Sequence, residues 1–412
     1  MKMSIIIPVY NVEKYLDECL ATVCRQTLEE IEVICINDCS ADSSPVILEK
    51  WSKIDDRIVV LDNARNGGLS YTRNVGLRHA RGDYVYFIDS DDYLYDDRVL
   101  EKGFKYLSNC KLDGLLVDAE VIYEDNYTGD DYNGIRKYQY AGVKNGQEMA
   151  AALWANRDID TPVWRYIWRR EFLLANQLQF QEGIIHEDFL FTLKSVLMSH
   201  RLMCINEKFY VYRKRKDSIT ASAAVAETRF YSYLTSYHEI LKFVEGRKLI
   251  DGADSLVIGW LKTISFNLLL SYLMIRKMRE YSREKMFHDT LQKVFLNHAW
   301  KERYKYLQDG MDSMQFELLQ NTECIIIYGA GKIGAEMLDL LSLYGLREKI
   351  KIAVSQGMGN LEGIEVHEIT DLKELRRKSV VVVAVSSKYR DAVMAELEIL
   401  GFESFFVYDS LY

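Results

Sequence analysis

Three aspartates lie within four positions in the segment Asp89-Ser90-Asp91-Asp92. Asp89 and Asp91 are two residues apart, so in extended backbone their carboxylates lie on the same side of the chain. Mg²⁺ or Mn²⁺ accepts such oxygen ligands and usually fills its remaining positions with phosphates and water. Such a site would neutralise charge on a departing nucleoside diphosphate, and it is favoured only when this segment is taken together with the other polar clusters below. The alternative is an acidic turn in which Asp92 caps the next helix.

Three more polar clusters follow apolar runs earlier in the chain. Asp38 can accept hydrogen bonds from a base N–H or a ribose hydroxyl, and Tyr10 can stack on a ring. Gly67 lets the backbone approach a ligand closely, and Arg73 supplies a forked cation for a phosphate or an acidic neighbour. The three clusters are Pro8-Val9-Tyr10-Asn11, Asn37 to Ser43, and Asn66 to Asn74.

The elements that precede these clusters alternate between strand and helix patterns. A strand–helix alternation predicts a parallel sheet covered by helices, and such sheets bind ligands beyond the carboxyl ends of their strands. The four polar clusters are therefore expected to form one site. The predicted strands are Ile5–Val9, Glu32–Ile36, Ile58–Leu61 and Tyr84–Ile88, and the predicted helices are Val12–Arg25, Ser44–Ile54 and Ser70–His79.

Taken together, the four motifs resemble those of the family 2 glycosyltransferases of GT-A fold, in order and in spacing. The resemblance covers roughly the first 220 residues and is specific because four motifs agree. It implies transfer of a sugar from a nucleotide donor, commonly a UDP-sugar, with Mn²⁺ or Mg²⁺ as cofactor and inversion at the anomeric carbon. Cys39 stands where the family often has glycine.

The resemblance also implies roles for individual residues. It assigns Asp91 to the metal. It assigns the nucleotide sugar to Pro8, Tyr10, Asn11, Asp38, Asn66, Gly67, Arg73, Asp89 and Ser90.

A general base is needed if an acceptor hydroxyl attacks the sugar directly. The pair Glu187-Asp188 begins a predicted helix, and a similar pair carries the base in the family, so the resemblance assigns Asp188. Both residues would equally favour a helix N-terminus through the helix dipole. His186 is a further, weaker candidate.

Bands of aromatic and basic residues occur around Trp164 and Arg213 and resemble elements of bacterial capsule and lipopolysaccharide transferases. Ring faces stack on sugars and arginines bind anions. Trp164, Arg213 and Ser218, with Glu187, are therefore candidates for the acceptor or diphosphate region. The alternative is a packed helix, predicted over Val163–Asn176, and a solvated basic loop.

Near the C-terminus, Gly329-Ala330-Gly331-Lys332-Ile333-Gly334 follows an apolar strand and precedes a helix. This context suits a dinucleotide site that would use Gly329, Gly331 and Gly334. The next strand, however, ends at Ser355 without the acidic residue that binds ribose. The segment resembles the Rossmann-like domains attached to some bacterial glycosyltransferases, in which similar glycines serve packing.

The chain has 412 residues and 48.0 kDa, enough for two or three domains. We expect a GT-A type α/β domain at 1–225, a helical region at 226–321 and a small Rossmann-like α/β domain at 322–412. A net charge of −9 argues against nucleic acid as the main partner. Seven scattered cysteines indicate a reducing cytosol rather than a disulfide framework.

The sequence thus predicts a cytoplasmic, metal-dependent, inverting glycosyltransferase that extends a bacterial surface polysaccharide or a lipid-linked oligosaccharide. The helical region leaves open a peripheral contact with the inner face of the membrane, because Val257–Ile275 is too interrupted by polar residues to span it. A homo-oligomer is also left open. Two alternatives remain, a nucleotidyltransferase and a nucleotide-binding regulatory or scaffolding protein that works through its C-terminal domain.

Overall fold

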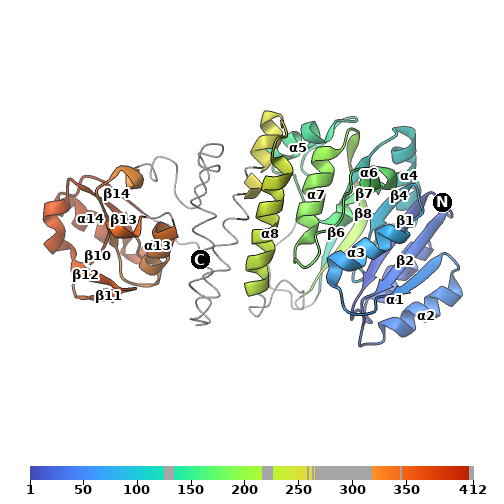
Figure 1. The fold of residues 1–412 in the computed structure, drawn as a ribbon, viewed down its shortest axis with the longest axis horizontal. Helices are drawn as coiled ribbons and strands as arrows, with labels where there is room; N and C mark the ends of the chain where they lie inside the picture. The colour runs from blue at the N-terminus through green and yellow to red at the C-terminus, as the bar shows by residue number, and fades with distance from the viewer. Residues whose placement is uncertain are drawn as a thin grey trace. The chain divides into compact units, whose positions relative to one another are not determined.

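The computed structural model divides into two compact units, Met1–Ile264 and Ser265–Tyr412 (Figure 1). Ser218, one of the predicted acceptor-region residues, lies outside the described residues. The structure describes residues 1–124, 134–215, 226–257, 259–261, 264, 318–343 and 346–407.

The first unit contains an eight-stranded sheet in the order β3-β2-β1-β4-β7-β6-β8-β5. Strands β3, β2, β1 and β4 are parallel, β7 is antiparallel to both β4 and β6, and β5 is antiparallel to β8. The strands are β1 (Met3–Val9), β2 (Ile31–Asn37), β3 (Ile58–Asp62), β4 (Tyr84–Phe87), β5 (Tyr93–Leu94), β6 (Gly114–Tyr123), β7 (Tyr166–Arg169) and β8 (Leu202–Lys214).

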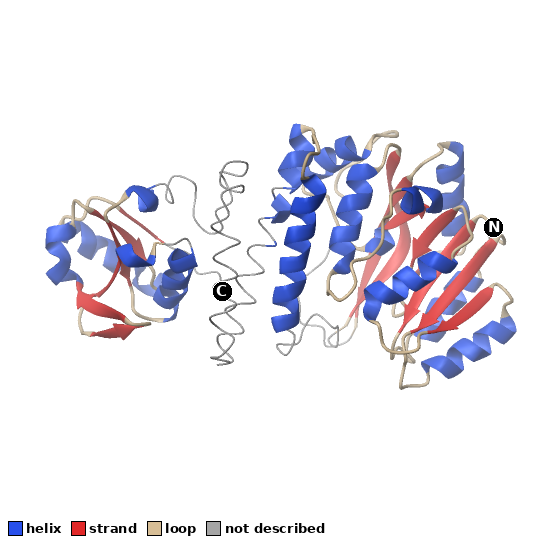
Figure 2. Cartoon of the chain, in the orientation of Figure 1, coloured by secondary structure: helices blue, strands red, loops and turns tan. Residues whose placement is uncertain are grey.

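Helices cover both faces of this sheet (Figure 2). Helices α1 (Leu16–Cys24), α2 (Ser44–Ile54) and α4 (Val99–Asn109) pack on the face that carries Ile5 and Ile7. Helices α3 (Gly68–His79) and α7 (Glu187–Met198) pack on the opposite face, against Ile6 and Phe87 respectively. All seven residues of β1 and of β2 are therefore buried, as expected for apolar strands covered on both sides.

The predicted helix over Val163–Asn176 is wrong in its central part. A 3-10 turn at Val163–Arg165 leads into strand β7, and only Arg170–Ala175 (α6) is helical. The residues of β7 pair with β4 on one side and β6 on the other. Aromatic and β-branched residues in a segment that fills a gap between two strands gain more from the sheet than from a helix.

Helix α8 (Ala226–Val244) packs on α7, so the first unit runs beyond residue 225, where the composition changes. Ser232 Oγ accepts a hydrogen bond from the N–H of Ile185, and Lys194 pairs with Glu239 at 2.9 Å. Helix α5 (Gly146–Ala155) also belongs to this unit and begins with a capping box at Asn145.

The second unit contains a six-stranded sheet in the order β11-β12-β10-β9-β13-β14, parallel except for β11. Its elements are β9 (Cys324–Tyr328), α13 (Lys332–Leu343), β10 (Ile350–Val354), β11 (Gly359–Leu361), β12 (Ile364–Glu368), β13 (Ser379–Val383), α14 (Arg390–Leu400) and β14 (Phe405–Val407). The predicted fold class, α/β with a second, Rossmann-like α/β unit, is confirmed.

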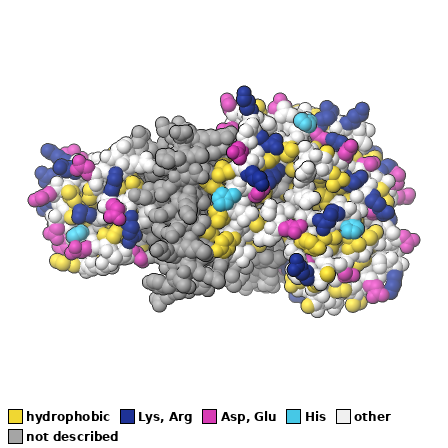
Figure 3. Space-filling model, viewed as in Figure 1, with side chains coloured by type: hydrophobic (Ala, Val, Ile, Leu, Met, Phe, Trp, Pro, Cys, Tyr) yellow, Lys and Arg dark blue, Asp and Glu magenta, His cyan; other side chains and the backbone are white. Residues whose placement is uncertain are grey.

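The surface carries acidic and basic side chains interspersed on the face shown in Figure 3. In the part of the chain that the structure describes, no helix is both long and apolar enough to cross a membrane.

Candidate active site

The carboxyl ends of the first four strands meet at one edge of the sheet, as predicted. Val9 at the end of β1 pairs with Asn37 of β2, which in turn pairs with Asp62 of β3. On the other side of β1, Ile6 pairs with Phe87, the last residue of β4. The polar loops that follow these strands therefore lie next to one another.

The loop after β1 is fastened to the loop after β2. Asn11 has a positive φ of 52°, its Oδ1 accepts from the N–H of Ala41 at 2.8 Å, and its own N–H donates to Ser40 Oγ at 3.1 Å. Tyr10, next to it, is 48% exposed, while Pro8 is buried within β1. The ring of Tyr10 is thus free to meet a ligand, and Asn11 shapes the loop that presents it.

Asp38 is buried and holds the glycine turn that starts α3. Its Oδ1 accepts from Asn63 Nδ2 at 2.7 Å and from the N–H of Gly67 at 2.8 Å, and its Oδ2 accepts from the N–H of Gly68 at 2.8 Å. The carboxylate therefore bridges the loops after β2 and β3. Asn66, directly before this turn, is exposed.

Gly67 and Gly68 have separate reasons to be glycine. A Cβ at Gly67 would lie 2.3 Å from the Tyr71 ring, and Gly68 has a φ of +79°. The turn thus combines a close approach with a left-handed backbone, both of which favour glycine.

Arg73 links Asp89 of the aspartate turn to Glu187, the neighbour of the predicted base Asp188. It is only 2% exposed, and its Nη2 donates to Asp89 Oδ1 at 2.7 Å, while its Nη1 donates to Glu187 Oε1. Burial lowers the pKa of the guanidinium, but the charges of Asp89, Glu187 and Asp188 more than offset this and raise its pKa overall. Arg73 is therefore a fixed cation between α3, the aspartate segment and α7.

Asp188 lies partly buried in the first turn of α7. Burial, and then the charge of Glu187, raise the pKa of Asp188 to about 8, while Arg73 lowers it and Asp89 raises it. A carboxyl with a pKa near neutrality is suited to general base catalysis. His186 precedes it with a φ of +60°, and burial lowers the pKa of its imidazole.

Residues near the end of β8 contact the aspartate turn that follows β4. Arg215 Nη2 contacts Asp91 Oδ2 at 2.8 Å, and the Asp91 side chain remains 25% exposed. Burial and the neighbouring charge of Asp89 raise the pKa of Asp91, against the effect of Arg215. Ser90 is buried between the two aspartates, 5% exposed.

Asp92 and Arg213 complete this turn. Asp92 is 2% exposed, and its two oxygens accept from the hydroxyl of Tyr210 and from the N–H of Arg213, both at 2.7 Å. Arg213 Nε also donates to the carbonyl of Asp91 at 3.1 Å. The alternative in which Asp92 caps a helix is not what the structure shows, because its carboxylate is used by β8.

The donor set suits a hard cation that is completed by a substrate. Among the described residues, no group of three or more His, Cys, Asp or Glu side chains is placed to hold a metal ion alone. Asp91 is partly exposed and meets Arg215 through Oδ2. One carboxylate with phosphate oxygens and water is a usual arrangement for Mg²⁺. The residues present therefore fit a divalent ion held jointly with a diphosphate.

Trp164 lies in the core rather than on a surface. It is 3% exposed and stacks on Tyr210 with ring centroids 4.5 Å apart and planes 2° apart. Its ring packs against β8, so its contacts are structural ones, as in the alternative in which Trp164 is a packed core residue.

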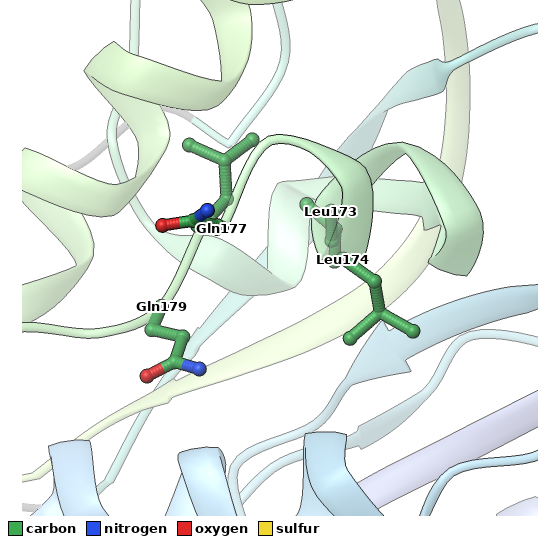
Figure 4. Close-up of a pocket in the computed structure, with 5 residues that line it drawn as sticks. Leu173, Leu174, Gln177 and Gln179 are labelled. Carbon is green, nitrogen blue, oxygen red and sulfur yellow. The ribbon is translucent and has the colours of Figure 1, made fainter.

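None of the predicted site residues lines a pocket of about 370 Å³ on the first unit (Figure 4). It is formed by α6 and the segment after it. The lining residues are Leu173, Leu174, Gln177, Leu178 and Gln179.

The glycine motif of the second unit is explained mainly by packing. A Cβ at Gly329 would lie 2.4 Å from the Ala384 carbonyl oxygen, and one at Gly334 would lie 1.8 Å from the Gly329 carbonyl oxygen. Gly331 has open space around it. At the position of the missing acidic residue, Ser355 donates to Glu396 at 2.9 Å.

Sequence reasoning missed Arg215 and Tyr210, although both contact the aspartate turn. The sequence indicates only a band of aromatic and basic residues around Arg213 and does not predict strand β8. The alternation of Phe209, Val211 and Arg213 with Tyr210 and Tyr212 was the available signal for a strand.

The first unit is an α/β fold whose polar loops gather at one edge of the sheet, where such folds bind ligands. Residues 4–195 match the model of glycosyl transferase family 2, so this part of the chain is similar to that family. A solved structure of Staphylococcus aureus TarS residues 1–349 in complex with UDP-GlcNAc covers 88% of this chain and 95% of its own, with a TM-score of 0.60 and 23% identity, a likeness of fold.

Curated relatives match the first unit as well. Glycosyltransferase EpsJ of Bacillus subtilis is 34% identical over 236 residues, 53% of this chain and 62% of the relative. Poly(ribitol-phosphate) beta-N-acetylglucosaminyltransferase TarS of S. aureus is 32% identical over 239 residues, 57% of this chain and 39% of the relative. The chain therefore spans less than two thirds of the length of these relatives.

Proposed function

We propose that this protein is an inverting, metal-dependent glycosyltransferase that moves a sugar from a nucleotide donor, a UDP-sugar, to a hydroxyl of a polysaccharide or lipid-linked oligosaccharide in bacterial surface glycan synthesis. The observation that carries the proposal is the bridge made by Arg73. It joins Asp89 of the donor-side turn to Glu187, the neighbour of the proposed base Asp188. A direct sugar transfer requires a base near the bound donor, and this bridge keeps the aspartate turn close to the start of α7.

On the donor side, the nucleoside lies over the loops that follow β1 and β2, where Tyr10 offers an exposed ring. Asp38 acts there by holding the Gly67-Gly68 turn, whose backbone the ribose or diphosphate approaches. Arg73 acts on the donor through Asp89 rather than by reaching the phosphates itself, because it is buried and paired.

Asp91 is the proposed protein ligand of Mn²⁺ or Mg²⁺. When bound, the ion supplies a positive charge that stabilises the departing diphosphate. Arg213 and Arg215 place two further positive charges at the same turn. Arg215 would turn from Asp91 toward the phosphates once the carboxylate has a metal to neutralise it.

Asp188 accepts the proton of the acceptor hydroxyl while that oxygen bonds to the anomeric carbon. The bond from the anomeric carbon to the diphosphate oxygen breaks in the same step, so the configuration inverts. Glu187 keeps the base in place through its ion pair with Arg73. A phosphate-bearing polyol such as the acceptor named for TarS belongs to the acceptor class we propose, together with other surface glycans.

The test uses the full chain with UDP and Mn²⁺ in a calorimeter, followed by assays of donor hydrolysis and transfer over a panel of nucleotide sugars. Asp91→Ala is expected to abolish metal-dependent binding and turnover while the chain stays folded. Its matched control is Asp56→Ala, an exposed aspartate in the turn before β3. Asp188→Asn is expected to bind UDP normally and to lose transfer.

Asp391→Asn serves as the control for Asp188→Asn, because Asp391 also lies in the first turn of a helix but in the second unit. Unchanged turnover by Asp91→Ala would reject the metal role, and normal transfer by Asp188→Asn would move the base elsewhere. A wild-type chain that binds NAD but no UDP would instead favour a regulatory role of the second unit.

A further inference from the structure

The hydroxyl of Tyr210 connects two points of the aspartate turn from a different strand. It accepts a hydrogen bond from the N–H of Asp89 at 3.1 Å and donates one to Asp92 Oδ2 at 2.7 Å. Tyr210 is fully buried, so water does not compete for either bond. A single phenol oxygen thereby sets the distance between the start and the end of the turn.

The ring that carries this hydroxyl is itself held in place. It stacks on Trp164 with the planes almost parallel, and its backbone pairs with Leu94 of β5, just beyond the turn. Trp164 is in turn buried in the main core of the first unit. The position of the Tyr210 hydroxyl is therefore fixed by packing and pairing that do not involve the aspartates.

Asp92 gives the turn a second attachment to β8. Its Oδ1 accepts from the N–H of Arg213, whose side chain returns to the carbonyl of Asp91. Two residues further along, Arg215 meets the Asp91 carboxylate. The turn and the basic end of β8 are thus attached to each other at successive positions, so that a shift of one would move the other.

We propose that Tyr210 and Asp92 are positioning residues of the donor site. They hold the backbone of the turn so that Asp89 and Asp91 keep their orientation, and they hold Arg213 and Arg215 over the same turn. The identity of the ligand rests on the proposed function, whereas the fastening of the turn does not. When neighbouring residues already hold the carboxylates of a site in place, ligand binding does not have to pay the entropic cost of ordering those carboxylates.

The test is Tyr210→Phe in the full chain, which removes one oxygen and leaves the ring stack with Trp164. Asp89 N–H and Asp92 Oδ2 then lose a buried partner. We expect UDP in the presence of Mn²⁺ to bind roughly tenfold more weakly, a loss of about 1.4 kcal/mol that lies within the range for the two buried hydrogen bonds this hydroxyl makes. The donor KM should rise by a similar factor, with a smaller fall in kcat.

The matched control is Tyr86→Phe. Tyr86 is also fully buried, lies in β4 directly before the turn, and its hydroxyl has no hydrogen-bond partner among the described residues. Its loss should leave UDP affinity within about twofold of the wild type, because no buried bond is broken. A second variant, Asp92→Asn, keeps an oxygen for Arg213 N–H and should weaken UDP less than Asp92→Ala.

Hydrogen exchange separates this inference from the proposed function. The amide of Asp89 should exchange faster in Tyr210→Phe than in the wild type or in Tyr86→Phe, whether or not UDP binds. A wild-type chain without UDP affinity would therefore reject the proposed function while the exchange result still decides on the fastening. Unchanged exchange, or unchanged UDP affinity in a chain that does bind UDP, would overturn the positioning role.

Discussion

The pKa of Asp188 offers the sharpest test of the electrostatic coupling between Asp188, Glu187 and Arg73. Burial and the charge of Glu187 raise it to about 8, against Arg73. A carboxyl whose pKa is higher in the folded than in the unfolded chain, where it is about 3.9, holds its proton more tightly when folded. Its contribution to stability is therefore lost as pH rises from about 4 to about 8. Over the same range it gains the ability to act as a base.

Glu187→Gln removes the neighbouring charge and keeps an oxygen that can accept from Arg73. Two unit charges about 6 Å apart at an effective dielectric of about 20 interact by roughly 2.8 kcal/mol, equivalent to about two pH units. Solvent reaches Asp188 in part, which reduces this value, so we expect a downward shift of about one to two units. Arg73, freed of its Glu187 charge, acts in the same direction.

The assay is the pH dependence of kcat/KM for the donor, together with the melting temperature measured from pH 5 to pH 9. Wild type should show a rising limb near pH 8, and Glu187→Gln should show it near pH 6 to 7. The melting temperature of the variant minus that of the wild type should increase between pH 6 and pH 9. The coupling between Glu187 and Asp188 would be refuted if the rising limb of the pH profile stayed near pH 8 in the variant. It would also be refuted if the difference in melting temperature between variant and wild type did not change with pH.

Two further substitutions test single contacts. Gly334→Ala places a Cβ 1.8 Å from the Gly329 carbonyl oxygen and should destabilise the second unit by about 1–3 kcal/mol. Faster amide exchange in β9 and β13 would report this loss of stability. The control Gly331→Ala, where a Cβ has open space, should change the stability by no more than about 1 kcal/mol. Asp38→Asn places an amide N–H₂ against the backbone N–H donors of the glycine turn and should weaken UDP binding tenfold or more. The control Asp62→Asn replaces an exposed carboxylate and should change UDP binding little. Equal effects within either pair would contradict the contact concerned.

The sheet of the first unit could be predicted because its strands are covered on both faces. A strand such as Ile31–Asn37 reads as an apolar run, and the helices between the strands show their own period. The order of polar residues after the strands then followed from the topology of parallel sheets. That part of the site required no knowledge of side-chain contacts.

The segment from Val163 to Asn176 shows where such reading fails. Its aromatic and basic residues fit a helical pattern as well as a strand, and what decides is the gap between β4 and β6 that β7 fills. Only the three-dimensional arrangement of partners distant in sequence supplies that information. Trp164 was similarly ambiguous, since a ring that binds sugar and a ring that packs on Tyr210 look alike in a sequence.

The other contacts of the site that could not be predicted join residues far apart in the sequence. Arg73 was expected to contact the ribose-diphosphate or an acidic neighbour, and in the structure it has two acidic neighbours, one of them 114 positions away. Arg215 lies 124 positions from Asp91. No spacing rule connects such residues, because their separation depends on the lengths of intervening loops.

In the proposed reaction, Arg73 connects the donor side with the base. A buried guanidinium that pairs with Asp89 and Glu187 together cannot leave either without exposing an unpaired charge, which is costly inside a protein. If the proposed donor binds at the aspartate turn, it acts on the same cation that holds the start of α7. If Asp89 is drawn toward a ligand, more of the Arg73 charge becomes available to Glu187 and Asp188, and the pKa of Asp188 falls. The base would thus become ionised most readily when a donor is in place, so that the deprotonation of the acceptor follows donor binding.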